Sequence, residues 1–203
     1  MNTSAEPEAL LTEAQAGSTA HLGRLLELYR HYLRLMARVQ VGQRLQAKVD
    51  ASDLVQETML EAHKSFPGFR GSSEPQFVAW LRQIMAAVLC NLVRRYLGTQ
   101  GRDVRLEREL RQNIDRSSIL LAHGLVDPHS SPSQQAARRE QAVVLADALA
   151  KLPEDYREVL VCRHLEGLSF PEIGRRMDRS LDSVQKLWVR GLARIRRVMG
   201  VSQ

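Results

Sequence analysis

Apolar residues recur at intervals of three and four along two stretches of the chain, residues 20–97 and 141–199. This spacing is typical of helices that bury one face, and no segment sustains the apolar–polar alternation of a half-buried strand. The intervening residues 98–140 are polar and irregular. The pattern therefore predicts an all-α protein with two small helical domains, residues 1–97 and 141–203, joined by a polar linker.

Two helices of the first domain have clear starting residues. Ser18 is a favoured N-cap residue, and the apolar spacing that follows it continues through Val39. A second helix begins near Asp50 or Ser52, which also favour N-caps, and runs to Phe66 before a Pro-Gly pair stops it. The pattern predicts one long helix followed by a shorter one.

The third helix is expected to begin after Ser73, which has the spacing of a capping box with Gln76. Gly98 follows its last turn. Its apolar positions share one face and are expected to pack in the core. They are Phe77, Trp80, Leu81, Ile84, Val88 and Leu92.

The second domain contains a short helix, a tight turn and a long helix. Ser169 and Glu172 have capping-box spacing, and Ser180 is a favoured N-cap for the helix that runs to Arg197. This arrangement is typical of a helix-turn-helix unit. Such pairs also occur in proteins that never bind DNA, so the surface of the long helix is the deciding feature.

The exposed side of this long helix is basic. Residues 186–197 include five basic side chains and no acidic one, whereas a merely solvated helix usually mixes charges. A recognition helix places the residues of its first turns against base edges, and other side chains bind phosphates. The residues expected to meet DNA are Asp182, Ser183, Gln185, Lys186, Arg190 and Arg194.

The net charge agrees with a nucleic-acid partner without establishing one. The 203 residues include 29 Lys and Arg against 23 Asp and Glu, a formal net charge of +6. Residues 1–20 contain three glutamates and no Lys or Arg, so the basic excess lies in the remainder. An excess of this size also occurs where basic residues serve only solubility.

Composition excludes several classes of protein. Cys90 and Cys162 are too few for a disulfide framework or a Cys-x-x-Cys zinc site. No window reaches the roughly 18 uncharged apolar residues of a membrane span, and no basic start and apolar run of a secretory signal is present. We therefore expect a cytoplasmic protein with no membrane segment.

The sequence offers no catalytic site. Asp53 and Glu57 lie one helical turn apart and suggest a metal site with His63, but His63 lies off their face, so a solvated acidic surface is favoured. No nucleotide-binding glycine loop, metalloprotease motif or hydrolase nucleophile motif occurs. We expect no catalytic residue, no metal and no cofactor.

Two blocks of residues resemble a known family. The first reads Asp-Ala-Ser-Asp-Leu-Val-Gln-Glu-Thr at 50–58 and continues with Phe-Pro-Gly-Phe at 66–69 and Phe-x-x-Trp-Leu at 77–81. The second reads Leu-Pro-x-x-Tyr-Arg-Glu-Val-Leu at 152–160 and Glu-Ile-Gly-x-x-Met at 172–177. In this order, around a polar linker, they resemble regions 2 and 4 of bacterial sigma factors of the extracytoplasmic-function (ECF) group.

The resemblance implies a subunit that binds core RNA polymerase, places it at a promoter with −35 and −10 elements, and helps to open the duplex. The family's helix corresponding to Asp53, Gln56 and Glu57 docks on the clamp coiled coil of the β′ subunit, and its second domain meets the β flap. The loop Phe69–Gln76 and the following helix correspond to the part that melts the −10 element and captures a flipped base. The helix Ser180–Arg197 corresponds to the reader of the −35 element.

The same resemblance implies contacts to double-stranded and melted promoter DNA. Four arginines around the first domain's last helix are expected to meet the backbone near the −10 element: Arg70, Arg82, Arg94 and Arg95. Phe77 and Trp80 are expected to serve mainly the core. An anti-sigma protein is a further partner that the sequence leaves open.

Two other functions also remain open at this point. A helical DNA-binding regulator that acts without polymerase would need only the second domain, and the first block of motifs argues against it. A metal-dependent enzyme using Asp53 and Glu57 is the least favoured alternative, and catalytic activity without polymerase would revive it.

Overall fold

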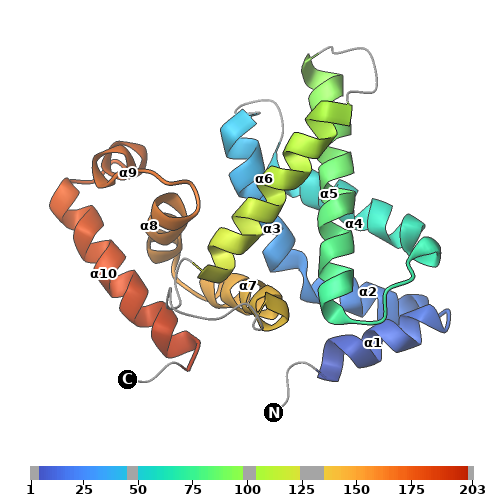
Figure 1. The fold of residues 1–203 in the computed structure, drawn as a ribbon. Helices are drawn as coiled ribbons and strands as arrows, with labels where there is room; N and C mark the ends of the chain where they lie inside the picture. The colour runs from blue at the N-terminus through green and yellow to red at the C-terminus, as the bar shows by residue number, and fades with distance from the viewer. Residues whose placement is uncertain (1–4, 45–49, 98–103, 124–134, 201–203) are drawn as a thin grey trace. The chain divides into compact units, whose positions relative to one another are not determined.

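The computed structural model describes residues 5–44, 50–97, 104–123 and 135–200, and all regular structure in these ranges is helical (Figure 1). The chain divides into two compact units, residues 1–116 and 117–203. The prediction of an all-α fold is confirmed.

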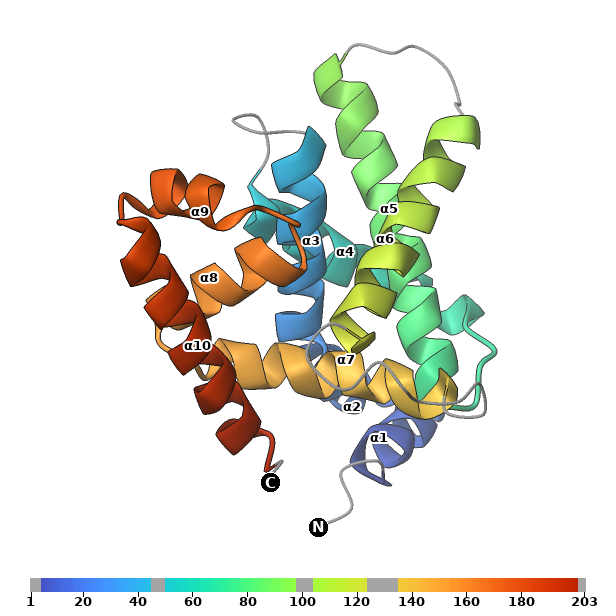
Figure 2. The ribbon, with the colours of Figure 1, turned by 60° about the vertical axis from the view of Figure 1, so that its left-hand side comes forward.

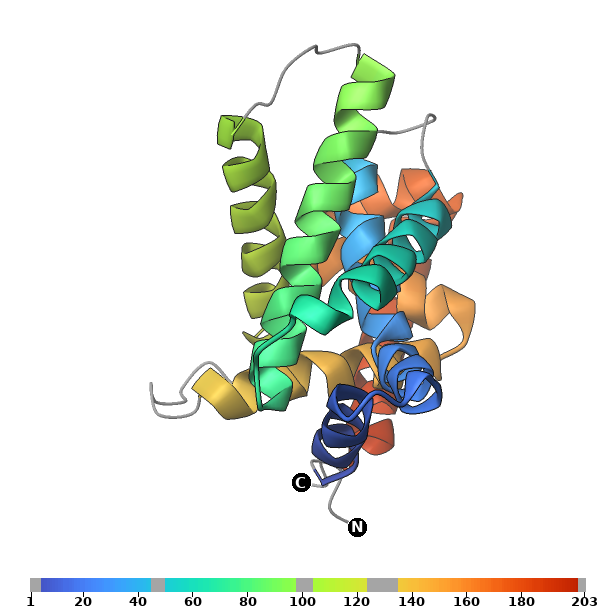
Figure 3. The same ribbon diagram turned by 90° about the vertical axis from the view of Figure 1, so that its right-hand side faces the viewer.

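The first unit is built around a long helix, α5. Its elements are α1 (Ala5–Gln15), α2 (Thr19–Leu28), α3 (Arg30–Arg44), α4 (Ala51–Ser65), the 3-10 turn η1 (Phe66–Gly68), α5 (Glu74–Leu97) and the first part of α6 (Val104–His123). Helix α1 packs on α2, and α4 contacts both α3 and α5 (Figures 1 and 3). The fully buried side chains are mostly aliphatic, as the low aromatic content requires.

The predicted helix starts at Ser18 and Asp50 are confirmed. The Ser18 side chain accepts the backbone N–H of His21, and the Asp50 carboxylate accepts that of Ser52 at 2.8 Å. The long helix expected from Ser18 to Val39 is in fact two helices, because the chain leaves helical geometry at Tyr29 (φ −99°, ψ 3°). The buried Tyr29 hydroxyl donates to Glu74 at 2.9 Å, a contact across 45 residues that local pattern does not reveal.

Helix α5 begins at Glu74, directly after the predicted N-cap residue Ser73. The Gln76 side chain accepts the backbone N–H of Ser72 at 2.7 Å, so it closes the preceding loop. Most predicted core positions are buried, whereas Trp80 and Ile84 are only partly covered. Over Glu74–Arg95 the helix is long and apolar enough to cross a membrane, but 61% of its most apolar window is buried, as in the core helix of a globular domain.

A helix, α6, occupies much of the segment that the sequence predicts to be an irregular linker. Leu110 and Ile114 lie one turn apart on it and are fully buried, and Asp115 pairs with Arg82 of α5 at 2.7 Å. Charged residues surround these two apolar positions, which is why periodicity did not reveal the helix. The compact units divide inside α6, after Arg116.

The second unit contains α7 (Gln135–Ala150), α8 (Glu154–His164), α9 (Phe170–Met177) and α10 (Leu181–Val198). Helix α10 packs against both α8 and α9 (Figure 2). At Gly191 an added Cβ would lie 3.4 Å from Leu160, so glycine lets α10 approach α8 closely.

Candidate nucleic-acid interfaces

The turn between α9 and α10 is fixed by two unusual backbone positions. Asp178 adopts the left-handed conformation (φ 50°, ψ 52°), which few residues other than glycine, asparagine and aspartate tolerate. The backbone N–H of Arg179 donates to the carbonyl of Gly174 at 2.9 Å, and a Cβ at Gly174 would lie 2.9 Å from the Arg179 carbonyl oxygen. Gly174 is therefore required for this close turn, although it lowers helix propensity.

Helices α9 and α10 are capped as predicted. Ser169 and Glu172 form a reciprocal capping box, in which the Ser169 side chain and backbone donate to the Glu172 carboxylate and hold its pKa below its ordinary value. The Ser180 side chain accepts the backbone N–H of Ser183 at 3.3 Å. These caps set where α10 begins and hence which side chains its first turns present.

The polar face of α10 is exposed where the sequence placed the DNA-contacting residues. Asp182, Gln185, Lys186, Arg190 and Arg194 are exposed, and Ser183 is partly buried beside its cap. Asp182 and Lys186 form an ion pair at 2.7 Å, with 74% and 64% of their side chains exposed. An exposed pair of this kind is worth at most about 1 kcal/mol, so both side chains are free to exchange it for base contacts.

One exposed apolar side chain lies on the same face and was missed in the sequence. Val189 is 57% exposed, three residues after Lys186 and four after Gln185, and therefore shares their side of the helix. The apolar spacing of this helix defines its packed stripe without Val189. Its position among polar residues was the available signal.

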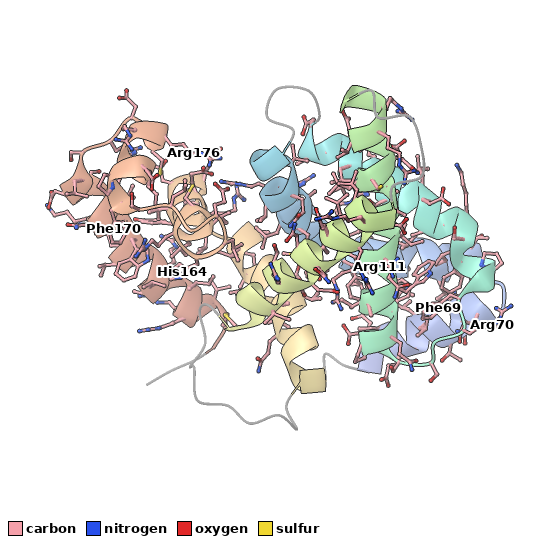
Figure 4. The ribbon with its side chains drawn as sticks, turned by 45° about the horizontal axis from the view of Figure 1, so that its top comes forward. Phe69, Arg70, Arg111, His164, Phe170 and Arg176 are labelled. Atoms are coloured by element: carbon pink, nitrogen blue, oxygen red, sulfur yellow. The ribbon has the colours of Figure 1, made fainter. Side chains whose placement is uncertain are left out.

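The opposite side of α10 is held by aromatic packing. The Trp188 indole N–H donates to His164 Nε2 at 3.0 Å, and its ring meets Phe170 edge-on at 5.5 Å. Figure 4 labels His164 and Phe170. Burial, together with the charge of Arg163, holds the pKa of His164 below its ordinary value. Arg194 lies over the ring of Tyr156 at 5.9 Å, which places its guanidinium at the edge of the proposed reading face.

The acidic face of α4 is exposed as expected. Asp53 and Gln56 are exposed, and Glu57 is partly exposed and lies 3.9 Å from Arg95. Leu60, one turn beyond Gln56, is 61% exposed and was not singled out in the sequence. Leu60 therefore lies on the same side of α4 as Gln56.

An aromatic cluster lies where η1 meets α5. Phe66, Phe69, Phe77 and Trp80 all approach one another with ring centroids 5.1–6.3 Å apart. Phe77 is fully buried, whereas Trp80 lies on the rim of the cluster and keeps part of its surface in solvent. Trp80 thus packs with the cluster as expected but is not fully buried.

The four arginines expected near the −10 element are not brought together. Arg70 is exposed at the loop before α5 (Figure 4) and donates to the carbonyls of Pro67 and Phe69 at 2.7 and 3.2 Å. Arg94 and Arg95 lie at the other end of α5, where Arg94 donates to Asn91. The Arg82 side chain is only 9% exposed and is paired with Asp115, so it has no surface to offer to DNA. Tyr32 of α3 and Asp115 of α6 both bond this side chain, and the sequence did not predict α6.

The described residues contain no group of three or more His, Cys, Asp or Glu side chains that could hold a metal ion. Asp53 and Glu57 accordingly have no third partner for a metal within this part of the chain. Burial raises the pKa of Cys162 to about 12, so its thiol stays protonated at neutral pH.

Comparison with known proteins agrees with the two blocks of motifs. Residues 28–99 match the family described as Sigma-70 region 2, and residues 142–195 match Sigma-70 region 4. Helices α1 and α6 lie outside both matches.

Curated relatives extend the similarity over most of the chain. An ECF RNA polymerase sigma-E factor of Haemophilus influenzae is 28% identical over 178 residues, which cover 88% of this chain and 87% of that protein. The factor of the same name from Escherichia coli K12 is 27% identical over 180 residues, covering 88% and 86%. A solved structure of CnrH in complex with the cytosolic domain of CnrY matches at 20% identity and a TM-score of 0.35, covering 98% of this chain and 99% of that one.

Regions 2 and 4 thus occur in the family's order, and they contain the exposed faces of α4 and α10 and the loop before α5. This chain belongs to the ECF group of the sigma-70 family and directs promoter-specific initiation of transcription by RNA polymerase.

Proposed function

We propose that α10 reads the −35 element through the side chains that its capped start presents. Gln185 suits adenine, Lys186 suits guanine, and Asp182 accepts from the amino group of cytosine. Val189 offers the apolar contact that a thymine methyl group favours. The exposed, weakly paired face of α10 is the observation that carries this proposal.

The later part of α10 supplies charge rather than sequence information. Arg190 and Arg194 follow one and two turns after Lys186, and both are exposed. Their guanidinium groups are suited to phosphates, while Ser183 adds a hydroxyl near the helix start. The helix thus combines base contacts at its beginning with backbone contacts farther along.

Core polymerase is proposed to bind the exposed face of α4. Asp53, Gln56 and Glu57 would meet basic and polar groups of the β′ clamp coiled coil, and Leu60 would fill an apolar site between them. The second unit is proposed to meet the β flap. Such docking would use Glu57, which in the free chain lies beside Arg95.

The −10 element is proposed to meet the loop before α5 and the aromatic cluster beside it. Trp80, on the rim of the cluster, offers a partly exposed ring for an unstacked base, and Arg70 lies on the adjacent loop. Arg94 and Arg95 would contact the backbone at the far end of α5. Arg82 is left out of this interface because it is buried against Asp115.

The chain is proposed to act in the cytoplasm with polymerase and to contribute binding and positioning without catalysis of its own. The test is gel-filtration co-elution with core polymerase, followed by run-off transcription from a promoter selected by the holoenzyme from a randomised pool. The variant Asp53→Lys with Glu57→Lys should lose co-elution while its melting temperature stays near wild type, because exposed helix charges contribute only tenths of a kcal/mol.

The matched control is Glu8→Lys with Glu13→Lys, which makes the same change of charge on α1. It should co-elute as wild type does. Normal co-elution of the Asp53/Glu57 variant would show that α4 is not the docking helix. Specific promoter binding by the chain without polymerase would instead favour a DNA-binding regulator.

A further inference from the structure

The loop between η1 and α5, residues 69–73, is held by one of its own side chains and by side chains from two helices. From its own start, Arg70 donates back to the carbonyls of Pro67 and Phe69. From α5, Gln76 accepts the Ser72 backbone N–H at 2.7 Å. From α1, the Gln15 side-chain amide donates to the Gly71 carbonyl at 2.8 Å, 56 residues away in the sequence.

The loop has little room to adjust around Gly71. A Cβ at this position would lie 2.4 Å from the Phe69 ring and 2.9 Å from the Gln76 Cβ. The Gly71 backbone is thus pressed against the Phe69 ring, and that ring belongs to the aromatic cluster with Trp80. A shift of the Gly71 peptide would therefore move the aromatic surface itself.

The end of α1 that carries Gln15 is well packed. The last turns of α1 are anchored by Leu10, Leu11 and Ala14, which are 5%, 2% and 5% exposed. Gln15 itself is exposed, and Figures 1 and 3 show α1 beside the loop that leads into α5. Helix α1 lies outside the region 2 match, so this contact comes from a segment that the family's shared pattern does not include.

We propose that Gln15 is a positioning residue for promoter opening, acting through the Gly71 peptide on the loop and aromatic surface that receive the −10 strand. This inference rests on the proposed function of that loop. Without the hydrogen bond, the Gly71 carbonyl would turn to water and the loop would sample more conformations. If the loop must first become ordered, opening of the promoter duplex is slower. Initial binding through α4 and α10 does not use the loop and is therefore unaffected.

The test is the variant Gln15→Met, which keeps an unbranched side chain of similar length and removes the donor. Holoenzyme made with it is mixed with a selected promoter that contains a fluorescent adenine analogue in the −10 strand. The concentration dependence of the fluorescence rise separates closed-complex affinity from the opening rate constant. We expect the opening rate constant to fall about two- to ten-fold, the effect of one lost hydrogen bond.

Closed-complex affinity, co-elution with core and the melting temperature should all match wild type. The matched control, Thr12→Met, places the same side chain one turn earlier on the exposed face of α1, where Thr12 bonds only within its own helix. It should open at the wild-type rate. A second variant, Gly71→Ala, should slow opening more strongly, because its Cβ meets the Phe69 ring.

An unchanged opening rate constant in Gln15→Met would overturn the inference and leave the proposed function standing. Equal losses in affinity, core binding and opening would also overturn it, since they indicate general damage. A wild-type holoenzyme that binds the promoter but never unstacks the −10 strand would overturn the proposed function of the loop, and the role of Gln15 with it.

Discussion

The two proposed DNA-binding regions hold their side chains in different ways. On α10 the reading residues project from a capped helix and are engaged only by an exposed ion pair. Around the start of α5 the proposed receiving surface is a packed aromatic cluster and a loop whose backbone is hydrogen-bonded by side chains from α1 and α5. Substitutions on α10 should therefore change sequence preference at little cost in stability, whereas those near the cluster should affect folding as well.

The largest expected effect is on the stability of the first unit. Phe77→Ala should lower the free energy of unfolding by about 3–5 kcal/mol, because a fully buried ring that touches four other aromatic rings is removed. Trp80→Ala should lower it by about 2 kcal/mol, since part of that ring already lies in solvent. Urea unfolding of both variants measures the difference. Equal losses would place Trp80 in the core after all.

The second effect concerns sequence preference on α10. Gln185→Ala and Lys186→Ala should each reduce discrimination among −35 variants by about 1–3 kcal/mol. Arg190→Ala should instead weaken binding to all variants alike and reduce the salt slope by about one unit. Holoenzyme binding to a panel of −35 variants at several salt concentrations separates the two outcomes. Unchanged preference in the Gln185 and Lys186 variants would break the proposed division of the helix.

A smaller effect should isolate the role of Val189. If it packs on a thymine methyl group, replacing that thymine by deoxyuridine should weaken binding by up to about 0.8 kcal/mol, the value of one buried methyl-sized group. The same replacement should have no effect on Val189→Ala holoenzyme. Each thymine of the selected −35 element is replaced in turn. An equal loss in both proteins would show that Val189 does not contact the methyl group.

The smallest effect is a pH dependence of the second unit. The pKa of His164 is lowered by burial and by Arg163, so the folded state disfavours its protonation and the unfolded chain binds the proton more readily. The stability that its neutral form contributes is present above the ordinary histidine pKa of about 6.5 and decreases as the pH falls below it.

This decrease is measured by melting temperature between neutral and mildly acidic pH. The variant His164→Gln keeps an acceptor for the Trp188 indole N–H and does not titrate, so it should lose less stability than wild type. Parallel pH profiles for the two proteins would contradict the prediction. Because the variant removes only the titrating group behind α10, a difference between the two profiles is assigned to the contact between His164 and Trp188.

Local features of the fold could be predicted from the sequence because their causes lie within a few residues. The caps at Ser18, Asp50, Ser169 and Ser180 are examples, since each uses a partner two or three residues away. The exposed acidic face of α4 and the basic face of α10 also follow from helical spacing alone.

Features that depend on distant contacts could not be predicted in this way. The break at Tyr29 accompanies a hydrogen bond to Glu74, and the burial of Arg82 depends on Asp115, which is 33 residues farther along. Val189 and Leu60 were missed for a different reason. Helical spacing already places Val189 beside Gln185 and Leu60 beside Gln56, and the structure shows that both project into solvent.

Helix α6 lies in the chain between the two proposed DNA-binding regions. Its 20 residues span about 30 Å as a helix, whereas the same residues fully extended would span about 70 Å. Unfolding of α6 would therefore lengthen the tether between the regions, and it would require the release of Leu110 and Ile114 from their buried positions. We expect the tolerated spacing between −35 and −10 elements to depend in this way on the folding of α6.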